Sequence, residues 1–181
     1  MEVKITYFVH GTTTDNENNL ATGWLPGELS ETGREQAKML GQQVADKHFD
    51  VVFCSDLQRA IDSAELGFGG KYKIIRNERL RECNYGDMGG KSASNFKDRM
   101  EDFVDAPFPH GESYKDVEAR LVSFLDFLRT NYKGKHVAIV AHQAPQLALD
   151  VLLKSKSWQQ AIDEDWRKTK AWQPGWEYML S

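Results

Sequence analysis

Cysteine is scarce in this sequence: Cys54 and Cys83 are its two cysteines. They form no CxxC pair and no spacing typical of a metal site, so neither a disulfide scaffold nor a zinc module is indicated. Free thiols in a reducing compartment are the simplest interpretation. No apolar run approaches the roughly 18 residues of a membrane span, and the first residues, MEVKITYFV, lack the layout of a signal peptide. We therefore expect a cytoplasmic protein with no membrane partner.

Basic residues are not in excess over acidic residues either. The formal net charge is −4 at pH 7 and the pI is about 5.7, which argues against nucleic acid as a partner. Hydrophobic residues make up 40% of the chain and charged residues 28%, as in ordinary globular proteins. Because there is no internal repeat, low-complexity segment or linker, we expect residues 1–181 to form a single domain. The sequence does not indicate an oligomeric state.

The chain alternates between strand-like and helix-like patterns. Apolar runs and alternation predict strands over 2–9, 50–55, 71–76 and 135–142. Helical periodicity predicts helices within 29–47, 56–67, 112–132 and 145–153. Thr32 and Glu35 have capping-box spacing at the start of the first helix, and Gly67 is a candidate end of the second. This order predicts an α/β three-layer sandwich, with a mostly parallel central sheet and helices on both faces.

Two other segments have less regular patterns. Residues 79–95 are glycine-rich and irregular, and residues 171–180 are expected to form a terminal strand or arm. For the tryptophans, core packing is the simplest expectation; they are Trp24, Trp158, Trp166, Trp172 and Trp176.

Three polar residues follow strands of the expected sheet. His10 and His142 each end an apolar strand, and Arg59 follows the strand that ends near Ser55. Parallel strands bring such ends to one edge of a sheet, where ligands bind. A neutral imidazole can attack phosphorus, and arginine presents a planar fork of donors to phosphoryl oxygens. The pattern therefore predicts an anion-binding pocket.

Six segments, in order, resemble the histidine phosphatase superfamily, the group that contains cofactor-dependent phosphoglycerate mutase. VHGTTTDN resembles its Arg-His-Gly-x-Thr-x-x-Asn signature, and GWLPGELSETGREQA and CSDLQRAIDSAE resemble the two segments that follow. LRECNYGDMGG, HGESYKDVEAR and VAIVAHQ complete the series. One such motif is weak, whereas six in the right order are specific.

The resemblance implies a phosphoglycerate mutase-like fold and a reaction without metal or cofactor. His10 is then the nucleophile, which becomes a phosphohistidine, and Glu82 transfers the proton. Arg59, Asn16 and His142 are implied to hold the non-bridging oxygens of a small-molecule phosphomonoester. Further residues implied to bind phosphate or substrate are Gly11, Thr13, Thr22, Gly23 and Gln143.

Two positions depart from the family pattern. Val9 stands where the family has an arginine before the nucleophilic histidine, and Gln143 stands where it has a glycine after the second histidine. A hydrogen bond to a charged group contributes roughly 1.5–3 kcal/mol, so its loss from the transition state slows a reaction roughly 10- to 150-fold. Gln143 either offers a substitute donor or narrows the pocket.

Other interpretations of the same residues remain open at this point. His10 can be structural, Arg59 can form a surface salt bridge with Asp56 or Asp62, and Asn16 can be a turn residue. Hydrolysis is favoured over a mutase reaction because about twenty residues separate GDMGG from HGES, although the Thr22-Gly23 pair resembles the mutase substrate loop. An inactive phospho-ligand sensor or interaction module is a second class. A metallohydrolase is a third, and no HxH or HExxH motif supports it.

Overall fold

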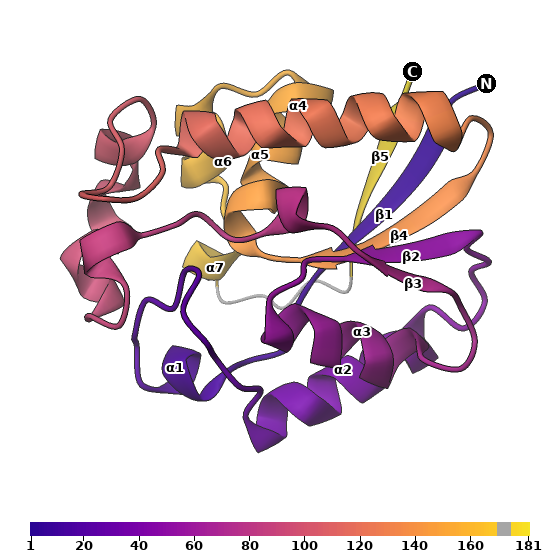
Figure 1. The fold of residues 1–181 in the computed structure, drawn as a ribbon, viewed down its shortest axis with the longest axis horizontal. Helices are drawn as coiled ribbons and strands as arrows, with labels where there is room; N and C mark the ends of the chain where they lie inside the picture. The colour runs from indigo at the N-terminus through magenta and orange to yellow at the C-terminus, as the bar shows by residue number, and fades with distance from the viewer. Residues whose placement is uncertain (170–174) are drawn as a thin grey trace.

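The computed structural model describes residues 1–169 and 175–181, and a five-stranded sheet lies at its centre (Figure 1). Its spatial order is β3-β2-β4-β1-β5. The strands are β1 (Val3–Val9), β2 (Val51–Cys54), β3 (Ile74–Arg76), β4 (His136–Ala141) and β5 (Trp176–Leu180). Neighbouring strands are parallel except β5, which runs antiparallel to β1. The mostly parallel sheet expected from the sequence is confirmed.

Helices cover both faces of this sheet (Figure 1). Helices α2 (Glu31–Gln43) and α3 (Gln58–Phe68) lie on one face, and α4 (Tyr114–Asn131), α5 (Gln143–Lys154) and α6 (Trp158–Asp163) lie on the other. The β4 side chains alternate between the two layers: Val137 and Ile139 belong to the core beneath α4 and α5, whereas Ala138 and Val140 belong to the core beneath α2 and α3. This double burial explains the unbroken apolar run of β4.

Two details at the helix ends differ from the prediction. The N-cap of α2 is Ser30, whose hydroxyl accepts from the Gly33 N–H; Thr32 already lies inside the helix. Gly67 lies inside α3, which runs on to Phe68. A Cβ at Gly67 would come within 3.0 Å of the Ala37 carbonyl oxygen on α2, so Gly67 permits close packing of the two helices rather than ending one.

The segment after β3 is irregular, as expected, but it contains short 3₁₀ helices. They are η1 (Glu78–Leu80), η2 (Gly86–Met88), η3 (Ala93–Asn95) and η4 (Lys97–Phe103). Aromatic packing orders this segment, since Phe103 stacks on Phe108 with 3.9 Å between ring centroids and Tyr85 packs against both Phe96 and Phe108. The short helices α1 (Thr14–Glu17) and α7 (Trp166–Thr169) complete the elements of the described chain.

The C-terminal expectation is confirmed as far as the structure describes it. Of residues 171–180, β5 forms the terminal strand, while residues 171–174, which include Trp172, lie outside the described residues. Trp158 and Trp176 are buried, as expected, but Trp24 is 38% exposed. No helix in residues 1–169 or 175–181 is long and apolar enough to cross a membrane.

Candidate active site

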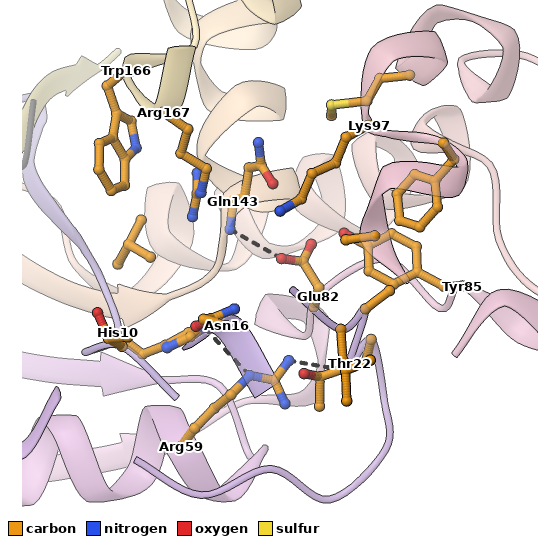
Figure 2. A pocket seen from close by; sticks show the side chains of 18 of the residues that line it. His10, Asn16, Thr22, Arg59, Glu82, Tyr85, Lys97, Gln143, Trp166 and Arg167 are labelled. Carbon is orange, nitrogen blue, oxygen red and sulfur yellow. Dashed lines mark hydrogen bonds between the residues drawn. The ribbon is translucent and has the colours of Figure 1, made fainter. Parts of the chain in front are cut away.

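A cavity of about 330 Å³ opens where β1 and β4 end and α3 begins (Figure 2). Its size suits a small molecule. Most of the residues predicted for the site line it: His10, Asn16, Thr22, Gly23, Arg59, Glu82 and Gln143. The strand-end argument therefore located the cavity correctly. Gly11, Thr13 and His142 lie behind this lining and support it.

Two hydrogen bonds fix the orientation and tautomer of His10. Its Nδ1 is 2.7 Å from the Gly11 carbonyl oxygen, and its Nε2 is 3.3 Å from Nε of Arg59. A carbonyl can only accept and a guanidinium can only donate, so Nδ1 carries the proton and Nε2 holds the free lone pair. Burial, followed by the Arg59 charge, lowers the pKa of His10 to about 3. His10 is therefore a neutral imidazole at physiological pH.

His142 lies directly behind His10. The two rings meet edge to face with 5.0 Å between centroids, and His142 is fully buried. Its backbone is held by Tyr7, whose hydroxyl donates to the His142 carbonyl and accepts from the His142 N–H. Neither ring nitrogen of His142 has a hydrogen-bond partner among the described residues. Buried polar atoms without a partner are rare, and a ligand in the cavity is one way to satisfy them.

Arg59 and Asn16 present oriented donors to the cavity. Arg59 is only 2% exposed, and its Nη2 donates to the Gly23 carbonyl at 2.7 Å. The surface salt bridge considered above is absent, because Asp56 pairs with Arg81 and Asp62 accepts from Gln58. The Oδ1 of Asn16 accepts from the Thr13 N–H, which leaves the amide NH₂ group of Asn16 free to donate.

Glu82 lies across the cavity from His10 (Figure 2). Its carboxylate accepts three backbone N–H groups: Cys83 at 2.8 Å, Ala144 at 3.0 Å and Gln143 at 3.2 Å. Two of these belong to the first turn of α5, where helix N–H groups lack internal partners. The Glu82 carbonyl is held separately by Trp24 Nε1 and by Arg120. The carboxylate is thus fixed beside the end of β4.

The remaining predicted residues shape the loops around the cavity. Thr13 is fully buried and caps α1 through a capping box with Asn16, so it orients Asn16. A Cβ at Gly11 would meet the Gly33 carbonyl oxygen at 2.2 Å, so the loop that follows β1 packs directly on α2. Thr22 donates to Asp15 at 2.8 Å. Gly11 and Thr13 therefore do not line the cavity; Gly11 permits close backbone packing and Thr13 orients Asn16.

The sequence analysis missed several residues that line the cavity. Helix α7 contributes Trp166 and Arg167, the η4 segment contributes Lys97, and Tyr85 and Tyr114 form part of the wall. Arg167 and Lys97 point inward from the side opposite His10 and Arg59 (Figure 2). No sequence motif marked these residues, because their position depends on how α7 and η4 fold back over the sheet edge.

Gln143 lines the cavity, and its Nε2 donates to Oδ2 of Asp165. Asp165 is buried and also accepts from the Arg167 N–H at 3.2 Å. Gln143 therefore connects α5 to the α7 segment.

We predict that buried His142 makes the protein acid-sensitive. Burial lowers the pKa of His142 well below 6.5 in the folded state, whereas the unfolded chain binds a proton near pH 6.5. Below that pH the unfolded state binds more protons, so the free energy of unfolding falls as pH falls, by about 1.4 kcal/mol per pH unit for this group. Urea unfolding of wild type and His142→Asn between pH 7.5 and 4.5 measures the effect. The variant should have the shallower slope, and equal slopes would contradict the prediction.

The described residues contain no group of three or more histidine, cysteine, aspartate or glutamate side chains placed to hold a metal ion. Cys54 and Cys83 are buried free thiols, and burial raises the pKa of Cys54 to about 12. A thiol with such a pKa is a poor nucleophile at neutral pH.

The chain is similar in sequence to both mutases and phosphatases. A 2,3-bisphosphoglycerate-dependent phosphoglycerate mutase of Methylorubrum extorquens is 34% identical over 161 residues, covering 80% of this chain and 76% of its own. Phosphoserine phosphatase 1 of Hydrogenobacter thermophilus is 30% identical over 156 residues, covering 81% of this chain and 74% of its own.

Solved structures extend this likeness to three dimensions. A mycobacterial glucosyl-3-phosphoglycerate phosphatase, in complex with VO₃, superposes with a TM-score of 0.77 and 30% identity, covering 88% of this chain and 86% of its own. The family model of the histidine phosphatase superfamily (branch 1) matches residues 7–171, from β1 to beyond α7. With this match and these relatives, the chain belongs to the histidine phosphatase superfamily.

Proposed function

We propose that this protein is a metal-independent phosphomonoester hydrolase that acts on a small phosphorylated metabolite through a phosphohistidine at His10. One observation carries the proposal: Nε2 of His10 is unprotonated, because Nδ1 donates to the Gly11 carbonyl and Nε2 accepts from Nε of Arg59. The low pKa of His10 keeps this nitrogen unprotonated at neutral pH, as a nucleophile requires. Arg59 donates to the same nitrogen in the ligand-free protein and marks where phosphoryl oxygens bind.

In the first half of the reaction, Nε2 of His10 attacks phosphorus and the bond to the leaving oxygen breaks. The Gly11 carbonyl stabilises the positive charge that develops on the imidazole, since it accepts from Nδ1–H. Arg59 and the free amide of Asn16, which both line the cavity, donate to the non-bridging oxygens. Glu82, across the cavity, gives its proton to the leaving oxygen.

In the second half, the Glu82 carboxylate takes a proton from a water molecule. That water attacks the phosphohistidine, which releases inorganic phosphate and restores neutral His10. The three backbone N–H groups that hold Glu82 keep its carboxylate in one place for both steps. Such positioning matters because one group acts first as acid and then as base.

A mutase reaction is the second candidate, favoured by the identity to phosphoglycerate mutases. A mutase must retain a bisphosphorylated intermediate while it turns over in the pocket, which requires a cover over the site. Here the segment available between η2 and α4 is short, and its residues Phe96, Lys97 and Met100 form one wall of the cavity. This favours hydrolysis.

The test is turnover of p-nitrophenyl phosphate in the presence of a chelator, followed by a panel of metabolite phosphates. Phosphate release under these conditions supports the hydrolase. Conversion of 3-phosphoglycerate to 2-phosphoglycerate without net phosphate release would favour the mutase. Metal-dependent activity would contradict a metal-free mechanism, and phosphate binding without any turnover would favour a phospho-ligand sensor.

A further inference from the structure

Arg167 is a cation in the cavity that the reaction scheme above does not use. Its side chain extends from α7 toward the centre of the cavity, on the side opposite Arg59 (Figure 2). The Nη1 atom of Arg167 is buried and makes no hydrogen bond with any described residue. A buried guanidinium nitrogen without an acceptor is costly, and an anion in the cavity would satisfy it.

The neighbours of Arg167 hold it in place and leave Nη1 without a hydrogen bond. Asp165 Oδ1 accepts from the Arg167 backbone N–H at 3.2 Å and forms an ion pair with Nη1 at 3.6 Å, beyond hydrogen-bond distance. Asp165 Oδ2 is engaged by Gln143, so this carboxylate mainly fixes the start of α7. The Arg167 guanidinium carbon also lies 4.6 Å from the centroid of the Trp166 ring, which orients its plane.

Both departures from the family pattern, Val9 and Gln143, affect where positive charge lies in the cavity. Val9, next to His10, is apolar, half-buried and packed against the core, so the end of β1 supplies no cation. Gln143, at the start of α5, holds Asp165 and through it the segment that carries Arg167. Val9 thus leaves the end of β1 without a positive charge, whereas Gln143 fixes the segment that brings the Arg167 guanidinium to the cavity.

We propose that Arg167 is a catalytic residue that donates to the phosphoryl group at His10 from the side opposite Arg59. This inference rests on the proposed function and adds a contact that the resemblance does not assign. Two guanidinium groups then face the equatorial oxygens, where charge must be stabilised in the transition state. Arg167 is a better partner than Lys97, which also points into the cavity, because a guanidinium donates two parallel hydrogen bonds.

The test compares Arg167→Gln with the matched control Lys168→Met, which removes an exposed cation of the same helix that does not line the cavity. Arg167→Gln should lower kcat/KM for p-nitrophenyl phosphate and weaken inhibition by inorganic phosphate, each by roughly 10- to 150-fold. Arg167→Lys should recover part of this loss. Lys168→Met should change both by less than about threefold, well under the effect of losing one hydrogen bond to a charged group. Equal effects of Arg167→Gln and Lys168→Met would overturn the proposal.

Moving the guanidinium from position 167 to position 9 gives a sharper test. Val9→Arg should change the wild type little but raise kcat/KM of Arg167→Gln about tenfold or more, because it returns a guanidinium to the same oxygens. The same gain in both backgrounds would mean that the sites act independently, against the proposal. Should Val9→Arg fail to fold, added methylguanidinium should restore part of the activity of Arg167→Ala and leave that of Lys168→Met unchanged. No restoration in Arg167→Ala would count against the proposal.

Calorimetry separates this inference from the proposed function. Inorganic phosphate binding does not require turnover, so it tests Arg167 even in a protein that hydrolyses nothing. If the wild type is active and Arg167→Gln binds phosphate as tightly as the wild type, the role of Arg167 alone is contradicted. If the wild type shows no turnover but Arg167→Gln binds phosphate more weakly, the hydrolase is contradicted and the anion site is supported.

Discussion

Replacing His10 by alanine is expected to abolish turnover, lowering kcat for p-nitrophenyl phosphate by on the order of 10⁴- to 10⁶-fold, the scale seen when a covalent nucleophile is removed. The neighbouring histidine, His142, is fully buried, and both free cysteines are buried as well, so none of these three is positioned to replace His10. The measurement is steady-state kinetics with thermal unfolding of each variant, so that loss of chemistry is distinguished from loss of folding.

His110→Ala is the matched control for this experiment. His110 is exposed, its Nδ1 pairs with Asp87, and it does not line the cavity. That variant should retain wild-type kinetics. His10→Asn adds a check on geometry, since an asparagine amide can still donate to the Gly11 carbonyl but cannot form a phosphohistidine. A folded His10→Ala protein with activity within tenfold of wild type would contradict the nucleophile assignment.

Replacing Glu82 by glutamine is expected to slow alkyl phosphates by roughly 10²- to 10⁴-fold in kcat/KM, the usual contribution of a general acid. Aryl phosphates should lose far less in kcat/KM, because their leaving groups scarcely need a proton. The amide oxygen of glutamine can still accept from Cys83 and Ala144, so the bonds lost are confined to the Gln143 side of the carboxylate.

Pre-steady-state kinetics of Glu82→Gln tests the second role of the same residue. If Glu82 is also the base that activates water, the variant accumulates phosphohistidine and releases a burst of p-nitrophenol equal to the enzyme concentration. Thermal stability close to wild type is the control for the missing hydrogen bond. Equal losses of kcat/KM for alkyl and aryl phosphates would contradict the general-acid role and indicate positioning alone.

The residues that the sequence located correctly lie at ends of buried strands. His10 follows β1 and His142 follows β4, and the hydrophobic patterns of these strands are strong enough to place both ends. Parallel pairing of β1 with β4, with Val9 opposite Ala141, then brings the two histidines together. Arg59 is placed by the same logic, since it is in the first turn of α3 just after β2.

The residues that the sequence did not locate depend on long-range packing. Arg167 and Lys97 belong to short helices without a strong hydrophobic repeat, and they enter the cavity only because α7 and η4 fold over it. Gln143 was noticed, but its bond to Asp165 joins residues far apart in the chain. The helix-end errors have a local cause: Ser30 and Thr32 are both acceptable caps, and only the tertiary structure selects Ser30.

The central claim is that His10 is phosphorylated during turnover, and trapping the intermediate tests it most directly. Wild-type protein is mixed with substrate labelled in its phosphoryl group, quenched within milliseconds in base, and digested for peptide mapping. A phosphohistidine is labile in acid and comparatively stable in base, so the account predicts base-stable, acid-labile label on the peptide that contains His10. The label should increase in Glu82→Gln and disappear in His10→Ala. Label that survives in His10→Ala, or that resists acid, would contradict the account.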